Sequence, residues 1–294
     1  MKIIVTGSLG NISKLLTEAL VAKGHAVTVI SSDPKKQAAI EKTGAAAAIG
    51  SLEDAQFLTA IFTGADAVYT MVPPDFTALD QLARYYSIGN SYAQAIRDSG
   101  VKRVVNLSSW GAHLEKGTGI IEGSYQVEKI FSTLANVQIT QLRPTSVYYN
   151  LYHYIDMIKG SEIIGTNFGG TDSIVMVSPL DIADVAAEEL TSHSSGNTVR
   201  YIASDERTCN EIAAVLGEAI GKPDLQWLTF SDQQVQESME NYGVPSLIAT
   251  KLVELNAAIH SGLMRGDYDL HPPKQMGKVK LEDFARDFAF AFKQ

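Results

Sequence analysis

The first 31 residues constrain the fold of this chain more than any other stretch. Residues 2–6 form a β-branched run, Lys-Ile-Ile-Val-Thr, which is typical of a strand buried on both faces. The run ends at Gly7, after which apolar residues recur with the period of a helix as far as Gly24. Residues 26–31 then read as a second buried strand. A strand, a glycine turn, a helix and a strand within about 30 residues predict a βαβ unit.

The glycine turn has the spacing Gly7-x-x-Gly10-x-x-Ser13. Gly7 permits a tight turn, Gly10 lets the backbone approach a phosphate, and Ser13 is small enough to replace the usual third glycine. The helix N-terminus that follows presents N–H groups and a partial positive charge, which hold a pyrophosphate without a basic side chain. A glycine turn also occurs for structural reasons alone, but its position between a strand and a helix predicts a dinucleotide site.

Composition argues against several other classes of protein. The 294 residues include 33 acidic and 24 basic side chains, a net charge of −9 that opposes direct binding to nucleic acid. The first strand begins at residue 2 and no apolar run reaches membrane-spanning length, so we expect no signal peptide, no membrane span and a cytoplasmic location. Cys209 is the single cysteine, and no grouping of Cys and His predicts a metal site.

Further strands are predicted at residues 45–49, 67–72, 103–107 and 138–142, with helices between them. This alternation predicts an α/β fold built on a doubly wound parallel sheet of the Rossmann type. We expect residues 1–150 to form the NAD(P)-binding domain. Residues 151–294 are expected to form mainly a smaller mixed α/β domain, with residues 175–205 or so returning to the Rossmann core.

In the C-terminal region, residues 233–261 read as helical. The expected core positions of this helical stretch are Met239, Tyr242, Leu247, Leu252, Leu255 and Ile259.

The residues after the second strand should lie near the adenine ribose, where NAD and NADP differ. No acid ends the strand, whereas Ser31 and Ser32 offer hydroxyl groups and Lys35 offers a positive charge. These residues favour NADP over NAD. The adjacent Asp33-Pro34 pair fits the start of a short helix better than a contact to the ribose.

Two more strand ends contribute to the expected nucleotide site. Ser51 and Leu52 follow the third strand and should edge the adenine. Met71, Val72 and Pro73 follow the fourth strand and should lie over the ribose and phosphates. A stiff loop is the alternative interpretation of the prolines there.

Two patterns suggest catalytic side chains. Ser108 follows the fifth strand beside the expected nicotinamide, where it either bonds a substrate oxygen or the carboxamide, or only shapes a turn. Tyr125 and Lys129 have the Tyr-x-x-x-Lys spacing of the proton-donating pair of short-chain dehydrogenases. They lie opposite the apolar stripe of their helix, which is typical of a solvated face.

Six short motifs follow one another along nearly the whole chain. They are residues 6–12, the Arg143-Pro144 turn that ends in Asn150, and residues 181–186, 211–213, 243–245 and 283–287. In the order and spacing of these motifs the chain resembles NmrA-like members of the atypical short-chain dehydrogenase/reductase superfamily. The resemblance implies an NAD(P)-binding Rossmann domain and a small C-terminal domain that closes over the nicotinamide end.

The resemblance also implies roles for individual residues. The implied pyrophosphate contacts are Thr6, Gly7, Leu9, Gly10, Asn11 and Ile12. Met71 to Pro73 are implied contacts to the ribose region, and Thr145 and Asn150 are implied to form the wall on the nicotinamide side.

Two departures from the family pattern bear on function. The family often has an arginine after the second strand, where this chain has Ser32. Aligning the helix around Val127-Glu128 places Ser124 where the family has a lysine or histidine, and Ile120 where the superfamily has its catalytic tyrosine. Tyr125 and Lys129 are then out of register with the catalytic pair.

Four tyrosines cluster after the sixth strand, where a substrate site is expected. They are Tyr148, Tyr149, Tyr152 and Tyr154. They would either stack on a planar substrate such as a quinone or pack the domains together.

These observations predict an NAD(P)H-dependent oxidoreductase that reduces a small quinone or conjugated carbonyl, with NADP or NAD as cofactor. One alternative is a non-catalytic NAD(P)-binding redox sensor that acts through a protein partner. The second alternative, a nucleotide-sugar epimerase or dehydratase, would need the catalytic tyrosine. A homodimer is left open.

Overall fold

A computed structural model describes residues 1–75, 80–192 and 196–294. The chain divides into two compact units, each made of several segments. The first unit contains Met1–Ala112, Gly123–Arg143 and Ile182–Arg200, and the second contains His113–Glu122, Pro144–Asp181 and Tyr201–Gln294. Within the described ranges, no helix combines the length and the apolar character that crossing a membrane requires.

A sheet of seven strands forms the centre of the first unit, in the order β10-β6-β5-β4-β1-β2-β3. The strands are β1 (Lys2–Val5), β2 (Ala26–Ser31), β3 (Ala46–Ile49), β4 (Ala67–Thr70), β5 (Arg103–Leu107), β6 (Gln138–Pro144) and β10 (Thr198–Ile202). Every pair from β6 across to β3 is parallel. The order reverses between β1 and β4, so the predicted doubly wound α/β sheet is confirmed.

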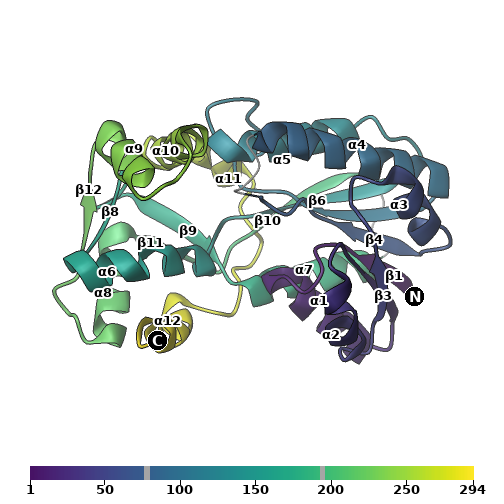
Figure 1. The fold of residues 1–294 in the computed structure, drawn as a ribbon, viewed down its shortest axis with the longest axis horizontal. Coiled ribbons are helices and arrows are strands. Elements are labelled where there is room, and N and C mark those ends of the chain that lie inside the picture. The colour runs from purple at the N-terminus through teal and green to yellow at the C-terminus, as the bar shows by residue number, and fades with distance from the viewer. Residues whose placement is uncertain (76–79, 193–195) are drawn as a thin grey trace. The chain divides into compact units, whose positions relative to one another are not determined.

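Helices cover both faces of this sheet (Figure 1). One face carries α3 (Ala55–Phe62), α4 (Gln81–Ser99) and α5 (Glu122–Phe131), and the other carries α1 (Asn11–Ala22), α2 (Gln37–Glu41) and α7 (Pro179–Thr191). Ile3, Ile4 and Val5 are completely buried, as expected for a central strand covered on both sides. The α4 helix begins where the Asp80 carboxylate accepts a hydrogen bond from Ala83 N and ends at the left-handed Gly100.

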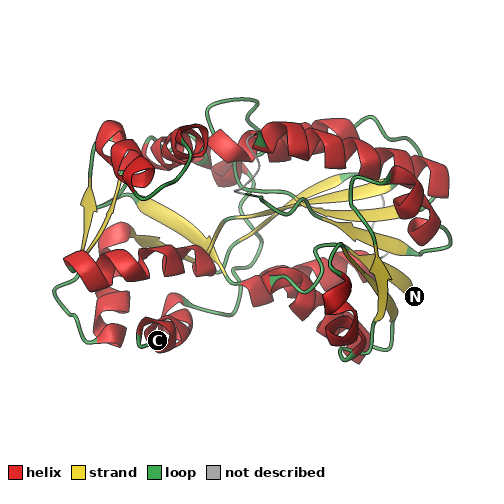
Figure 2. Ribbon diagram, in the orientation of Figure 1, coloured by secondary structure: helices red, strands yellow, loops and turns green. Residues whose placement is uncertain are grey.

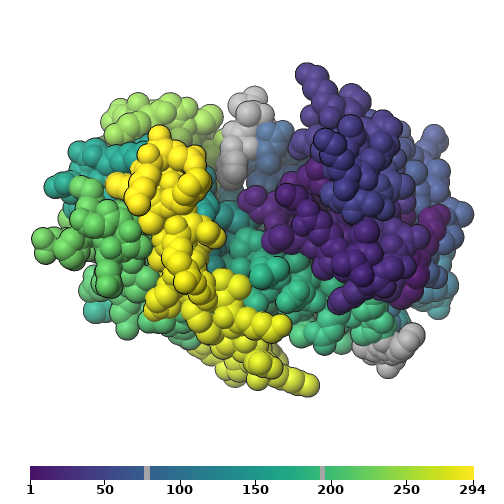
Figure 3. All heavy atoms as spheres, turned by 90° about the horizontal axis from the view of Figure 1, so that it is seen from below, coloured from purple at the N-terminus to yellow at the C-terminus, as the bar shows by residue number. Residues whose placement is uncertain are grey.

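The second unit contains two small sheets surrounded by helices (Figure 2). Its strands are β7 (Ser146–Val147), β8 (Ile163–Thr166), β9 (Ser173–Val177), β11 (Asp205–Thr208) and β12 (Gln226–Thr229), in the orders β11-β9-β7 and β12-β8. Its helices are α6 (Ile155–Ser161), α8 (Cys209–Ile220), α9 (Asp232–Asn241), α10 (Ser246–His260), α11 (Arg265–Leu270) and α12 (Leu281–Phe292). The yellow α12 lies on the outside of this unit and packs against α8 (Figure 3).

Aromatic rings form much of the core of the second unit. The ring pairs are Tyr148 with Phe284, Tyr152 with Phe288, and Tyr154 with Trp227, with centroids 5.2, 5.9 and 5.1 Å apart. The Tyr148 hydroxyl also donates to Val279 O over 3.2 Å. Three of the four clustered tyrosines therefore pack within this unit, a role different from the substrate stacking and from the packing between domains that the sequence suggested.

The helical character predicted over residues 233–261 is confirmed except for a break that divides the stretch into two helices. The α9 helix ends at Asn241 and α10 begins at Ser246, because Gly243 is left-handed (φ 86) and Pro245 starts the new helix. The interruption resets the helical face, so two expected core residues are exposed: Tyr242 by 88% and Leu247 by 57%. Ile248, Ala249 and Val253 are buried instead.

Candidate functional site

The glycine turn joins β1 to α1. Gly7 is left-handed (φ 88), and a Cβ on it would lie 2.5 Å from Ser13 Oγ and 2.9 Å from Met71 Sδ. Only glycine fits there. Ser13 is buried directly against the turn, so it is the small side chain that allows α1 to pack closely.

The α1 helix begins without a side-chain cap. Gly10 N donates to Gly7 O over 3.1 Å, and the first bond of the helix runs from Lys14 N to Gly10 O over 2.9 Å. The N–H groups of Asn11, Ile12 and Ser13 precede that bond and have no acceptor within the helix. A Cβ on Gly10 would meet only Gly7 O, at 3.2 Å. This open helix N-terminus has the geometry that binds a phosphate group.

Backbone and hydroxyl groups tie the end of β2 to the glycine turn. The Ser8 hydroxyl donates to Ser31 Oγ over 3.0 Å, and Ser31 Oγ accepts from Asp33 N over 3.2 Å. The Asp33 carboxylate accepts from Lys35 N and caps a short 3₁₀ helix, η1 (Pro34–Lys36), as its sequence indicates. Ser31 is thus buried and connects the end of β2 to the glycine turn, whereas Ser32 and Lys35 are exposed.

The end of β4 is fixed beside the same turn. Met71 N donates to the hydroxyl of the buried Thr6 over 3.0 Å, and the Tyr92 hydroxyl donates to Met71 O over 2.8 Å. Burial raises the pKa of Tyr92, so its phenol keeps the proton that it donates. Met71 and the pair Thr6-Gly7, which were predicted to contact different parts of the nucleotide, therefore belong to one framework.

The other predicted cofactor contacts lie in two different places. Leu9, Val72 and Pro73 lie in the first unit close in sequence to this framework, with Val72 buried and the other two half-buried. At the end of β3, Ser51 is exposed and Leu52 is half-buried.

Two predicted residues belong to the second unit. Thr145 is buried and its N–H donates to Ile202 O over 3.0 Å, whereas Asn150 is exposed in η3 (Tyr148–Tyr154). Their role on the nicotinamide side stays a prediction.

Ser108 lies directly after β5 and belongs to a charged network that the sequence analysis missed. Its N–H donates to Leu142 O over 2.8 Å, and its hydroxyl donates to Glu128 Oε1 on α5. Arg143, at the end of β6, binds the same carboxylate with two bonds, Nε to Oε1 (3.0 Å) and Nη2 to Oε2 (2.7 Å). The Glu128 and Arg143 side chains are only 12% and 7% exposed. The available signal was an arginine at the end of a strand predicted to be buried, because a buried charge requires a partner.

A second buried polar array crosses the same part of the sheet. The Thr70 hydroxyl donates to Asn106 Oδ1 over 2.9 Å, and Asn106 Nδ2 donates to Gln141 Oε1 over 2.7 Å. The three residues are neighbours in the registers of β4, β5 and β6. Polar groups therefore replace apolar packing towards the carboxyl ends of these strands, where ligands bind in sheets of this type.

The Tyr125 and Lys129 pair lies on α5 outside its most buried stripe. Tyr125 is half-buried and Lys129 is exposed, whereas Val127 and Phe131 of the same helix are buried in the core. This arrangement agrees with the face expected from the periodicity. A catalytic role for the pair stays a prediction.

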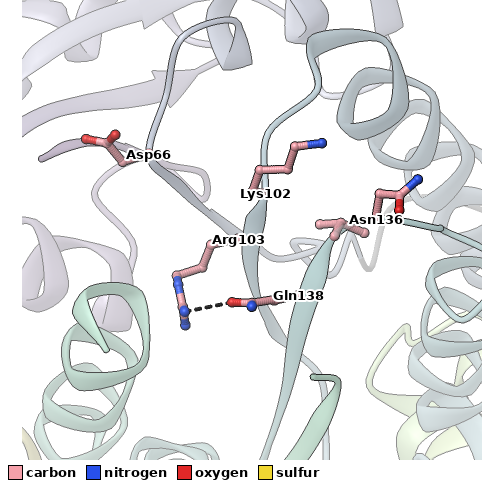
Figure 4. Close-up of a pocket in the computed structure, with 6 residues that line it drawn as sticks. Asp66, Lys102, Arg103, Asn136 and Gln138 are labelled. Carbon is pink, nitrogen blue, oxygen red and sulfur yellow. Dashed lines mark hydrogen bonds between the residues drawn. The ribbon is translucent and has the colours of Figure 1, made fainter. Parts of the chain in front are cut away.

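A cavity of about 490 Å³ lies at the opposite end of the sheet, where β4, β5 and β6 begin (Figure 4). It is lined by Asp66, Lys102, Arg103, Asn136, Val137 and Gln138. The Arg103 guanidinium donates to Gln138 Oε1 over 2.8 Å, and Lys102 points in another direction. The two cations do not converge on a common point, and the cavity is remote from the glycine turn.

Comparisons with known proteins agree with this geometry. The sequence profile of the NAD(P)H-binding family matches residues 7–193. A search of curated protein sequences found no match.

Solved structures of similar fold include the triphenylmethane reductase of Citrobacter sp., with 21% identity, a TM-score of 0.80 and coverage of 99% of this chain and 100% of that one. The NADPH-dependent quinone oxidoreductase of Escherichia coli, solved with NADPH, has 18% identity, a TM-score of 0.75 and coverage of 97% and 99%. A nucleoside-diphosphate-sugar epimerase of Staphylococcus aureus has 14% identity, a TM-score of 0.78 and coverage of 97% and 100%. At these identities the likeness concerns the fold.

Proposed function

This chain belongs to the NAD(P)H-binding family, within the NmrA-like, atypical short-chain dehydrogenase/reductase group that its motifs indicate, and on that premise we propose that it is an NAD(P)H-dependent oxidoreductase. Its proposed substrate is a small quinone or conjugated carbonyl. The observation that carries the proposal is the open N-terminus of α1 behind Gly7 and Gly10, at the reversal of strand order in the sheet.

The residues of the first unit divide the nucleotide site into three parts. The N–H groups of Asn11 and Ile12 would hold the pyrophosphate. Ser32 and Lys35 are exposed after β2 and would meet the adenine ribose, where a lysine favours the 2′-phosphate of NADP. Ser108 would lie at the nicotinamide end, after β5.

The bound nucleotide would supply the hydride. The protein would contribute binding and orientation, and it would exclude water from the reacting atoms. The Ser108 hydroxyl is not arranged as a proton donor to the acceptor, because it already donates to Glu128. Quinone reduction suits such a site, since the reduced quinone can take its proton from solvent. The dye reductase and the quinone oxidoreductase of similar fold are named for conjugated acceptors, which supports this substrate class.

Titration and turnover test the proposal. Purified protein is titrated with NADPH and with NADH by calorimetry, then mixed with menadione while absorbance of the reduced nucleotide is followed. We expect tighter binding of NADPH and steady oxidation on addition of the quinone. Binding without oxidation across several quinones and enals would overturn the enzymatic proposal, and absence of nucleotide binding would overturn the site itself.

A redox sensor is the second candidate function. It is favoured by the engaged Ser108 hydroxyl and by the exposed Lys129, which leave no assembled catalytic pair among the residues of the first unit that the structure describes. Such a protein would bind the nucleotide tightly, leave quinones unreduced and act through a protein partner. An epimerase or dehydratase is disfavoured because Ile120 stands at the aligned position of the catalytic tyrosine. If Tyr125 served that chemistry instead, Tyr125→Phe would abolish turnover.

A further inference from the structure

The direction of the hydrogen bond at Ser108 determines what this residue can offer to a ligand. A carboxylate only accepts hydrogen bonds, and a guanidinium only donates. Since Arg143 binds both oxygens of Glu128, the single hydroxyl proton of Ser108 points to Glu128 Oε1. Only the lone pairs of Ser108 Oγ then remain for any other group.

This orientation is held from several sides. The two bonds from Arg143 prevent the Glu128 carboxylate from rotating away, and charge-assisted bonds of this paired kind are the strong ones in proteins. The bond from Ser108 N to Leu142 O fixes the backbone beneath the hydroxyl. Ser108 is 7% exposed, so its oxygen is screened from bulk water.

We propose that Glu128 is a positioning residue that turns Ser108 into a hydrogen-bond acceptor for an N–H or O–H donor of the bound ligand. The inference rests on the proposed function, because it assumes that nucleotide and substrate meet at the carboxyl end of β5. Two ligand groups have this chemistry: the carboxamide N–H of the nicotinamide, and a hydroxyl group on the substrate or its reduced product. In either case Ser108 does not donate a proton to a carbonyl oxygen.

The first arm of the test removes the donor from the nucleotide. Calorimetry compares NADP⁺ with its 3-acetylpyridine analogue, in which a methyl group replaces the carboxamide NH₂. The wild-type protein should bind NADP⁺ about fivefold more tightly, the ratio that one neutral hydrogen bond provides. Ser108→Ala should bring the ratio close to one. Glu128→Gln should do the same, because an amide can donate to Ser108 Oγ and release the hydroxyl proton outward.

The second arm removes the hydroxyl donor from a ligand that stands in for the substrate or its reduced product. The protein saturated with NADP⁺ is titrated with 1-naphthol and with 1-methoxynaphthalene, which differ in the hydroxyl proton. Preference for the naphthol that disappears in Ser108→Ala would support the proposal and place the donor on the substrate side. Ser109→Ala is the matched control, since the neighbouring Ser109 contributes only its carbonyl, to Ala112 N. It should leave both ratios unchanged.

Unchanged ratios in Ser108→Ala, for both ligand pairs, would overturn the inference. This variant also covers the case in which Glu128→Gln fails to fold because Arg143 loses its charged partner. If Glu128 had only a structural role, Glu128→Gln would weaken the binding of all ligands equally and leave the affinity ratios unchanged. Turnover of menadione is measured separately. If Ser108→Ala changes a binding ratio but the wild type does not reduce menadione, this inference stands and the proposed reductase activity is overturned. If menadione is reduced but the ratios are unchanged, the reductase activity stands and this inference is overturned.

Discussion

The two glycines of the glycine turn, Gly7 and Gly10, differ in what an added side chain would disturb. A methyl group on Gly7 would enter space held by Ser13 and Met71 and would also require an unfavourable positive φ. A methyl group on Gly10 would meet only a carbonyl oxygen at 3.2 Å and would point to the open side. Gly7 is therefore required by the fold, whereas the role proposed for Gly10 is to let a ligand approach the backbone.

We expect Gly10→Ala to weaken NADPH binding by about tenfold or more, because the methyl group occupies the place where phosphates approach the backbone. The thermal midpoint without nucleotide should change little. Gly160→Ala is the control, since no atom lies near its added methyl group, and it should leave binding unchanged. Gly10→Ala with wild-type affinity would contradict the assigned site.

The residues of the site differed in how well the sequence revealed them. Gly7, Gly10 and Thr6 belong to a short local pattern, so their conformation follows from neighbours in the chain. Glu128 and Arg143 act through a bond across 15 residues, and only the packing of α5 on β6 joins them. A pattern read along one helix shows that Glu128 is polar but not what it contacts.

Among the elements, the last loop of the second unit depends on one carboxylate. Asp181, at the start of α7, accepts from Lys278 N (3.0 Å), Val279 N (3.2 Å) and the Ser204 hydroxyl (2.6 Å). It belongs to the sequence motif at 181–186, and the structure gives this position a clear structural role. A Cβ on Gly277 would overlap the same carboxylate, so the loop passes very close to it.

Asp181→Ala should lower the free energy of unfolding by about 3 kcal/mol, because the buried Ser204 hydroxyl and the half-buried N–H groups of Lys278 and Val279 lose their acceptor. Urea denaturation measures the loss, and limited proteolysis near residues 277–279 should become faster. Asp224→Ala, which removes an exposed carboxylate of the same unit, should have almost no effect. Equal stability of the two variants would show that the loop is held by other contacts.

The start of α8 carries a capping box in which Thr208 and Glu211 exchange hydrogen bonds. The bonds from Thr208 N and the Thr208 hydroxyl hold the pKa of Glu211 below its ordinary value. Because the folded pKa is the lower one, this contribution is complete above the unfolded pKa near 4.5 and disappears as pH falls through the folded value.

Glu211→Gln should therefore be less stable than the wild type at neutral pH, and the difference in the free energy of unfolding should narrow as the pH falls from the ordinary value of 4.5 through the lower folded pKa. Denaturation at several pH values measures it. Glu218→Gln, an exposed position on the same helix, is the control and should show no such trend. A difference that stays constant with pH would exclude the carboxylate as its source.

Element boundaries followed the sequence well where burial was continuous and poorly where it was not. The parallel strands read as β-branched runs because both of their faces are covered, and β2 and β5 occupy the predicted residues. The core positions predicted for the α9–α10 region were wrong where the apolar residues were assigned to one helical period across Gly243 and Pro245. A break of a few residues shifts every later side chain to another face.

At the scale of the whole molecule, the order of the strands could be inferred, since β1 to β6 follow the usual doubly wound path. The sequence also led us to expect that residues 175–205 or so return to the Rossmann core, whereas it gave no sign that His113–Glu122 belongs to the second unit. The chain leaves the first unit after Arg143 and returns to it at Ile182, and β10 then lies beside β6.

A fragment comprising residues 1–150 lacks β10, and so it leaves the long edge of β6 without its neighbour. Asn197 and Thr198 are lost with it, although they bind Ile139 N and the Thr140 hydroxyl in the complete chain. We expect this fragment to aggregate, because the unpaired N–H and C=O groups of an uncovered strand edge pair with other chains. Light scattering after expression, with the complete chain as control, measures it. A soluble, nucleotide-binding fragment would contradict this expectation.

The same edge has a consequence for how the protein is made. At about 5–20 residues per second, a ribosome needs several seconds to proceed from β6 to β10. Throughout that interval the sheet of the nascent chain lacks β10, while the residues translated between β6 and β10 belong largely to the second unit. β10, which completes the sheet of the first unit, is therefore translated well after β6. Until β10 has been made, the cell must prevent strands of other chains from pairing with β6.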